Sequence, residues 1–268
     1  MSTELRDKLV LVTGADRGIG KGIALAFAKA GTRVAAHGLA GPGEAQQLLA
    51  ELRQAGSPET RFFGGDLRDV KRIDALMAEV FAWGPVSILV NNAGIQHTAP
   101  LTDIAVEMWD DILAVNLSAA FHTMRHALPR MAQAQFGRVI NIASVHGLVA
   151  SISKSPYVSA KFGLVGLSKV AALEYAAVGS ASTGGVTVNC ICPGWVDTAL
   201  VAPQIAERRE QLGVSTEQAI DAMVAEKQPS RRLSSPAEIA RVAVWLCAPE
   251  AHNITGTAIP IDGGWTAQ

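Results

Sequence analysis

The stretch that decides the fold reads Leu9-Val-Leu-Val-Thr13-Gly14-Ala15-Asp16-Arg17-Gly18-Ile19-Gly20. Leu9–Thr13 is a short apolar run that predicts a buried strand, whereas the apolar spacing of Gly18–Ala30 predicts a helix. Glycines in the turn between them let the backbone approach a pyrophosphate closely, and the helix N-terminus presents free N–H groups and a favourable dipole. A glycine-rich turn is weak evidence alone, but this strand–turn–helix setting is what a phosphate-binding turn requires.

Short apolar runs alternate with helical patterns along the rest of the chain. Further strands are predicted at Arg33–His37, Arg61–Gly64, Ile88–Asn91, Arg138–Ile142, Val186–Ile191 and Ala258–Ile261, and further helices at Gly43–Ala55, Val70–Trp83, Met108–Gln133, Tyr157–Val178 and Pro236–Ala248. Strands buried on both faces and separated by helices predict an α/β fold in one domain, residues 1–268. This is a Rossmann-type, doubly wound sheet of seven parallel strands with helices on both faces. Leu200–Lys227 departs from the alternation as a helical excursion at the sheet's carboxyl edge, and it is expected either to cover a ligand or to form ordinary surface helices.

Composition argues against several classes of function. A net charge of −1 gives no electrostatic case for a nucleic-acid or membrane-surface partner. The apolar runs are too short to span a bilayer, and Met1–Arg6 lacks the order of a signal peptide, so we expect a cytoplasmic protein. Cys190 and Cys192 share one face of a predicted strand, and no Cys/His cluster completes a metal site. We interpret these cysteines as core residues and predict no bound metal.

A catalytic pair is suggested by Tyr157 and Lys161, which are four residues apart on a predicted helix and therefore share a face. An ammonium near the phenol is expected to lower the pKa of Tyr157 toward working pH, which would make the tyrosine a general acid/base. Ser144 can donate a hydrogen bond to a substrate oxygen or accept one. The chain has two tyrosines, so finding one in Tyr-x-x-x-Lys shortly after Ser144 favours a catalytic role over a surface role.

Together with the Gly-x-x-x-Gly-x-Gly spacing, Asn91-Asn92-Ala93-Gly94 and Pro193-Gly194, these motifs resemble the short-chain dehydrogenase/reductase family from end to end. The resemblance implies an NAD(P) site, and it implies that Asn116 orients a water beside Lys161. It also implies that Asp66 accepts from the adenine amino group, that residues 92–94 flank the adenosine ribose, and that Pro193–Thr198 hold the nicotinamide amide and phosphate. The residues expected to contact the cofactor are Gly14, Asp16, Arg17, Gly18, Ile19, Gly20, Leu39, Asp66, Leu67, Asn92, Ala93, Gly94, Tyr157, Lys161, Pro193, Gly194, Trp195, Val196 and Thr198.

The choice between NAD and NADP depends on the residues after the second strand. A 2′-phosphate needs Arg or Lys there, whereas a 2′-hydroxyl is often met by an acid. The chain has His37-Gly38-Leu39-Ala40-Gly41, which supplies neither, and the lack of a cation favours NAD. Arg17 favours NADP instead, because family members that use NADPH often carry a basic residue at that place.

Longer stretches resemble one group within the family, the bacterial D-3-hydroxybutyrate dehydrogenases. They are residues 91–99, 142–150, 153–157, 192–196, 226–230 and 262–267. The resemblance implies that the substrate carboxylate is held by Gln96, His146, Lys154 and Gln204, next to Ser144 and Tyr157, with Trp195 and Trp265 at the methyl end. A desolvated carboxylate needs a cation and several donors, which this set provides. Three competing interpretations stay open: His146 can serve as a turn cap, Lys154 can be a solvated loop residue, and Gln204 matches the group only by its position on a mobile helix.

The sequence therefore predicts an enzyme that interconverts D-3-hydroxybutyrate and acetoacetate with NAD, and the resemblance implies a homotetramer. One alternative is an NADPH-dependent 3-oxoacyl-thioester reductase, which would gain nothing from closing a carboxylate pocket. Another is a catalytically silent dinucleotide-binding regulator. Such a protein should lack a member of the set Asn116, Ser144, Tyr157 and Lys161, and this chain has all four.

Overall fold

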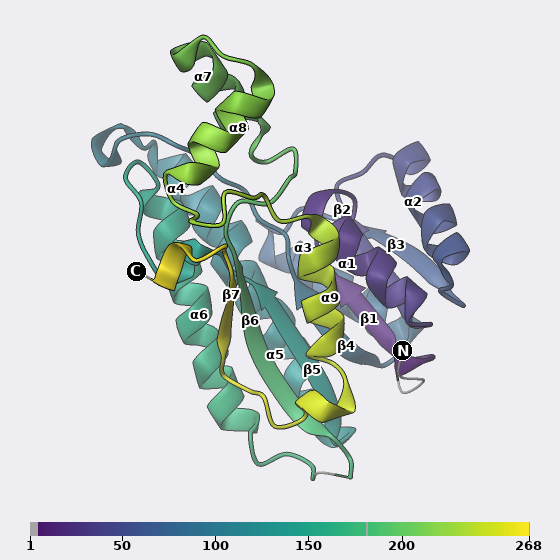
Figure 1. Cartoon of the computed structure of the whole chain (residues 1–268). Coiled ribbons are helices and arrows are strands. Elements are labelled where there is room, and N and C mark those ends of the chain that lie inside the picture. Colours follow the sequence, from purple (N-terminus) through teal and green to yellow (C-terminus); the bar gives the residue numbers. More distant parts are fainter. Residues whose placement is uncertain (1–4, 181, 268) are drawn as a thin grey trace.

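The first predicted strand lies near the middle of a seven-stranded parallel sheet in the computed structural model, which describes residues 5–180 and 182–267 (Figure 1). The sheet order is β3-β2-β1-β4-β5-β6-β7. The strands are β1 (Leu9–Val12), β2 (Arg33–Gly38), β3 (Thr60–Gly64), β4 (Val86–Asn91), β5 (Phe136–Ile142), β6 (Gly185–Pro193) and β7 (Ala258–Ile261). Strand order reverses between β1 and β4, and open α/β sheets bind ligands at the carboxyl ends of such strands. The predicted fold class is confirmed.

Helices cover both faces of the sheet. Because alternate residues of a strand point to opposite faces, each strand contributes side chains to two cores. Val10 and Val12 of β1 join a core with α1 (Gly18–Lys29), α2 (Pro42–Ala55) and α9 (Pro236–Trp245). Leu9 and Leu11 join a second core, with α3 (Val70–Trp83), α5 (Ala119–Gln133) and α6 (Ser155–Tyr175) (Figure 1). A strand that is buried on both faces has a continuous apolar run in its sequence, and this pattern predicted β1. Cys190 and Cys192 of β6 are fully buried, as their interpretation as core residues requires.

The predicted helix Met108–Gln133 is interrupted in the structure. It consists of α4 (Val106–Leu113), a π-helical turn at Ala114–Ser118, and α5. The π turn contains Asn116, whose side chain accepts a hydrogen bond from the Ile95 N–H and donates one to the Ile95 carbonyl, both at 2.8 Å. A π turn adds a residue to the helix and redirects a side chain, and such turns are frequent at functional sites. Apolar spacing records which side chains are buried and not the backbone hydrogen bonds, so it could not reveal the turn.

The excursion Leu200–Lys227 contains two helices, α7 (Ala202–Leu212) and α8 (Thr216–Ala225), which project beyond the carboxyl edge of the sheet (Figure 1). Gly213 ends α7 with a φ of 63°, a left-handed conformation that glycine adopts without steric cost. Within the described part of the chain, no helix is long and apolar enough to cross a membrane. Residues 1–4, on which the signal-peptide expectation partly rests, lie outside the described residues.

Candidate active site

The glycine turn between β1 and α1 has the shape of an anion cradle. Gly14 and Gly18 have φ angles of 62° and 52°, and a Cβ on Gly20 would collide with the Gly14 carbonyl oxygen. Arg17 precedes α1 without capping it, so the first N–H groups of that helix remain free for a ligand. A Cβ on Gly18 would lie 3.4 Å from Cγ2 of Thr198, so the turn faces the loop after β6. These residues fit the pyrophosphate of a dinucleotide.

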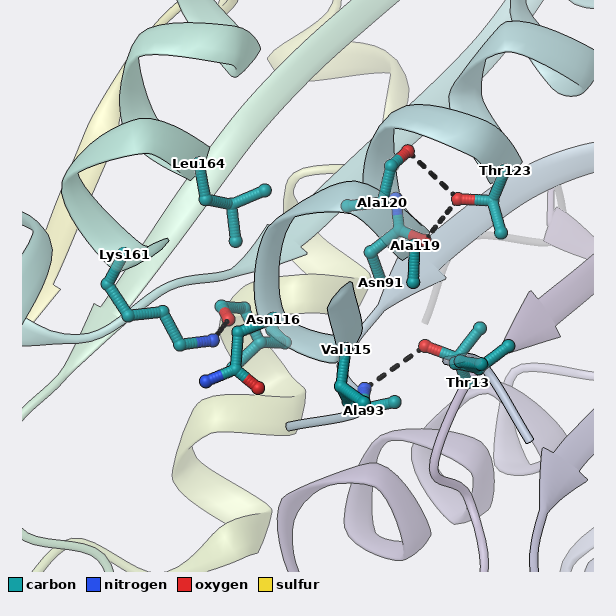
Figure 2. A pocket seen from close by; sticks show the side chains of 12 residues that line it. Thr13, Asn91, Ala93, Val115, Asn116, Ala119, Ala120, Thr123, Lys161 and Leu164 are labelled. Carbon is teal, nitrogen blue, oxygen red and sulfur yellow. Dashed lines mark hydrogen bonds between the residues drawn. The ribbon is translucent and has the colours of Figure 1, made fainter. Parts of the chain in front are cut away.

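Asn92 and Thr13 connect the ends of β4 and β1. The Thr13 hydroxyl accepts hydrogen bonds from the N–H groups of Asn92 (2.9 Å) and Ala93 (3.1 Å), the second of which Figure 2 shows. The Asn92 side-chain amide donates to the carbonyls of Thr13 (2.9 Å) and Gly14 (3.1 Å). Asn92 therefore holds the glycine turn through its amide hydrogens, and its predicted place beside the ribose stays a prediction.

Asp66 and Leu67 follow β3. Both carboxylate oxygens of Asp66 accept from the Arg68 guanidinium, and Oδ1 also accepts from the Arg68 N–H at 2.9 Å. These hydrogen bonds lower the pKa of Asp66, so the carboxylate is ionised and can accept only. Leu67 is buried in the second core. Leu39, at the end of β2, is 68% exposed.

The candidate catalytic residues Ser144, Tyr157 and Lys161 lie near the carboxyl end of β5. Ser144 precedes a 3-10 turn at Val145–Gly147 and caps it, because its hydroxyl accepts from the His146 N–H at 3.1 Å. Ser144 thus caps the start of this turn, and the His146 ring contacts the Val149 carbonyl that follows it. Tyr157 and Lys161 are both buried on α6, which begins at Ser155, two residues before its predicted start.

The expectation that Lys161 lowers the pKa of Tyr157 is wrong. Burial raises the pKa of Tyr157 to about 12, although a hydrogen bond with Ser144 opposes the rise. Burial also lowers the pKa of Lys161 to about 8. The Lys161 ammonium donates to the Ile142 carbonyl at 2.8 Å and lies 5.6 Å from the centroid of the Tyr157 ring. A low-dielectric surrounding penalises the charged form of both groups, and this cost of burial is the largest influence on each pKa.

A cavity of about 10 Å³ lies between Asn116 and Lys161, whose side chains point toward each other in Figure 2. This volume is close to the minimum that accommodates one water molecule, about 10–15 Å³. The cavity therefore fits the prediction that Asn116 helps to place a water beside Lys161. Because both ends of the Asn116 amide group bond to Ile95, the side chain has one fixed orientation.

A second cavity, of about 70 Å³, brings together nearly all residues of the predicted substrate pocket. Its walls include Gln96, Ser144, His146, Lys154, Tyr157, Trp195 and Trp265, together with Leu200 and Val201 from the excursion. Gln204, on α7, is not among the residues that line this cavity, but its Oε1 accepts from the Lys154 ammonium at 3.4 Å. The structure therefore gathers side chains from five separate parts of the chain around Tyr157.

Lys154 is 8% exposed, so its interpretation as a solvated loop residue is wrong. Burial lowers its pKa. Its ammonium contacts Gln204 and lies 5.1 Å from the centroid of the Trp195 ring. Among the described residues no carboxylate pairs with it, and it is the one lysine or arginine that lines the larger cavity. A buried, unpaired cation next to Tyr157 suits an anionic ligand.

His146 is 4% exposed, and its Nδ1 lies 3.3 Å from the Val149 carbonyl oxygen. A carbonyl only accepts, so Nδ1 carries the proton and Nε2 presents a lone pair. Burial first, and then the nearby Lys154 charge, lower the pKa of His146 to about 4. A neutral imidazole in this tautomer accepts a hydrogen bond at Nε2. It can donate to a carboxylate only after it gains a proton.

Gln228 is a functional residue that the sequence analysis missed. It is 1% exposed, its Oε1 accepts from the Trp195 N–H at 2.5 Å, and its Nε2 donates to the Arg232 carbonyl at 2.8 Å. A Cβ on Gly194 would collide with Gln228, so glycine is needed where this side chain reaches the loop after β6. The available signal was its place in residues 226–230, one of the stretches that carry the resemblance.

Comparisons with known proteins agree with this geometry. The short chain dehydrogenase family model matches residues 8–209. The D-beta-hydroxybutyrate dehydrogenase of Cupriavidus necator is 46% identical over 266 residues, covering 98% of this chain and 100% of the relative. The protein of the same name from Rhizobium meliloti is 43% identical, with coverage of 97% and 99%. A solved actinorhodin polyketide ketoreductase with NADPH has a TM-score of 0.88 and 35% identity, covering 100% of this chain and 99% of its own. The chain therefore belongs to the short-chain dehydrogenase/reductase family, whose oxidoreductases use a nicotinamide dinucleotide.

Proposed function

We propose that this oxidoreductase interconverts D-3-hydroxybutyrate and acetoacetate and uses NAD. The observation that carries the proposal is the buried Lys154 ammonium, which lines the same cavity as Ser144 and Tyr157. Burying a cation without a counter-charge is costly, and a substrate carboxylate would supply that charge. A short hydroxy acid spans the cavity with its carboxylate toward Lys154 and its hydroxyl toward Tyr157. The two D-beta-hydroxybutyrate dehydrogenases above support this substrate class.

The remaining walls of the cavity match the rest of such a substrate. Gln96 and Gln204 carry amide N–H groups that can donate to the second carboxylate oxygen. Trp195 and Trp265 lie with ring centroids 5.8 Å apart, and with Leu200 and Val201 they form an apolar wall for a methyl group. The long arm of a thioester substrate would gain nothing from the Lys154 ammonium.

Side chains of the protein carry out the proton transfer, whereas the cofactor carries out the hydride transfer. NAD, held by the glycine turn and by Pro193–Thr198, supplies the hydride acceptor when it is bound. Ser144 and Tyr157 share a hydrogen bond, and their hydroxyls hold the substrate oxygen. With its pKa raised to about 12, Tyr157 keeps its proton and donates it to that oxygen when acetoacetate is reduced; in the oxidation it first releases its own proton and then takes that of the substrate. The pKa of Lys161, lowered to about 8, lets its amine exchange a proton near neutral pH. The small cavity beside Asn116 has room for about one water, with which Lys161 would exchange that proton.

A direct assay tests the proposal. The purified enzyme should oxidise D-3-hydroxybutyrate with NAD, whereas the L-enantiomer should be a poor substrate. Acetoacetyl-CoA with NADPH, assayed in the reverse direction, represents the thioester reductase. A higher kcat/KM for the thioester pair than for acetoacetate with NADH would contradict the proposed function and favour that reductase.

A further inference from the structure

We propose that Asp16 of the glycine turn selects NAD over NADP, because its side chain places a carboxylate at the carboxyl end of β2. This inference rests on the proposed use of NAD and assigns the residue responsible for it. In many dinucleotide-binding folds the acid that meets the ribose 2′-hydroxyl follows the second strand. Residues 37–41 contain no acid, so the sequence favoured NAD only through the lack of a cation.

The position of the Asp16 side chain makes up for that missing acid. A Cβ built on Gly38, the last residue of β2, would lie 2.8 Å from both Cγ and Oδ1 of Asp16. The carboxylate of Asp16 therefore occupies the space into which an acidic side chain at position 38 would extend. Gly38 leaves that space open, and any larger residue would displace the carboxylate. Thus the carboxylate at the end of β2 is supplied by Asp16 of the glycine turn and not by a residue of β2 itself.

The hydrogen bonds of Asp16 leave one oxygen for a ligand. Its side chain is 9% exposed, and Oδ2 accepts from Nη2 (2.9 Å) and Nε (3.3 Å) of Arg17. Within residues 5–180 and 182–267, Oδ1 has no hydrogen-bond partner. A carboxylate oxygen only accepts, so it suits a ribose 2′-hydroxyl, which can donate. A 2′-phosphate carries about −1.5 to −2 charges and would be repelled.

Two of the neighbouring basic side chains, Arg17 and His37, do not offset this repulsion. Arg17, the residue that favoured NADP in the sequence, is 73% exposed and already paired with Asp16. His37 of β2 is 2% exposed, and its Nε2 lies 2.9 Å from the Gly65 carbonyl oxygen. Burial lowers the pKa of His37, so the imidazole is neutral near pH 7 and adds no positive charge at this end of β2.

Equilibrium binding of NADH and NADPH, without substrate, tests the role of Asp16 independently of catalysis. Both dissociation constants are measured by fluorescence titration for the wild type, Asp16→Asn, Asp16→Ser and Gly38→Ala, with thermal melting as a check of folding. Glu59→Gln is the matched control, because Glu59 is also paired with an arginine, Arg33, but at the amino end of β2. We expect Asp16→Ser to lower the ratio Kd(NADPH)/Kd(NADH) by about 10- to 100-fold, since juxtaposed like charges cost several kcal/mol and each 1.4 kcal/mol is tenfold.

Gly38→Ala should shift the ratio in the same direction without removing a charge, because its methyl group displaces the Asp16 carboxylate. Glu59→Gln should leave the ratio unchanged. A wild type that prefers NADH while both Asp16 variants keep its ratio would overturn the role of Asp16 and leave the hydroxybutyrate activity standing. A wild type that prefers NADPH would contradict the cofactor of the proposed function. In that case a further shift toward NADPH in Asp16→Ser would still support the role of Asp16.

Discussion

Replacing Lys154 removes the one lysine or arginine that the described residues place on the wall of the larger cavity. Lys154→Ala leaves a substrate carboxylate with neutral donors only, whereas Lys154→Met also removes the charge, which lies 5.1 Å from the Trp195 ring centroid, but keeps a long unbranched side chain. If the effect is electrostatic, both variants should lose affinity for D-3-hydroxybutyrate to a similar extent. A larger loss in Lys154→Ala alone would indicate that packing of the stem matters more than the charge.

The expected size of the effect follows from the burial of this side chain. A hydrogen bond to a charged group contributes about 1.5–3 kcal/mol, with more when the partner charge stays buried. Because Lys154 is 8% exposed, solvent cannot replace the lost ammonium, and the upper half of that range applies. Since 1.36 kcal/mol corresponds to tenfold, KM for the hydroxy acid should rise by about 1.7 to 2.2 decades, or by more.

Steady-state kinetics with D-3-hydroxybutyrate, together with NADH titration, measures this effect. The Kd of NADH should stay within about twofold of wild type, because Lys154 lies outside the residues expected to contact the cofactor. Lys169→Ala is the control, since Lys169 is an exposed lysine on the same helix. An unchanged KM in both Lys154 variants would refute the carboxylate pocket and with it the main support for the substrate.

Four further predictions concern other parts of the site. Tyr157→Phe should keep NADH binding and lower kcat by about 10²–10⁴-fold, the usual contribution of a positioned acid/base, and turnover close to wild type would exclude that role. Acetoacetate should bind more tightly as pH falls from 7 toward 5, because the anion raises the pKa of His146 from about 4 and binding then takes up a proton. Calorimetry in two buffers measures this uptake, which should vanish in His146→Gln; uptake that persists there belongs to another group. Gln228→Ala should destabilise the fold by about 1–3 kcal/mol, since it leaves the Trp195 N–H unpaired, and should also weaken NADH binding. Urea unfolding and NADH titration check both effects, and wild-type values would show that Gln228 does not position the loop. Amides of α7 and α8 should exchange hydrogen more slowly with NADH and acetoacetate bound than without them, and equal exchange would argue against a closing segment.

Features encoded in nearby residues could be predicted from the sequence. Strands buried on both faces need continuous apolar runs, and a phosphate turn needs glycines between a strand and a helix. Tyr157 and Lys161 share a helical face because they are four residues apart, which requires no tertiary information. For this reason the sheet, the glycine turn and the candidate catalytic pair can all be predicted from the sequence alone.

Features that depend on distant residues were decided only by the tertiary structure. Lys154 meets Gln204 across 50 residues, and Asp16 reaches the end of β2 only because the sheet pairs β1 with β2 and leaves Gly38 bare. The pKa of Tyr157 does not follow from its helical neighbour Lys161, since desolvation depends on everything packed around the phenol. The π turn at Asn116 has no signature in the sequence, because apolar periodicity does not record backbone hydrogen bonding. The sequence gives the identity of each residue. Its exposure to solvent, its charge state and its partners depend on the segments that the fold places next to it.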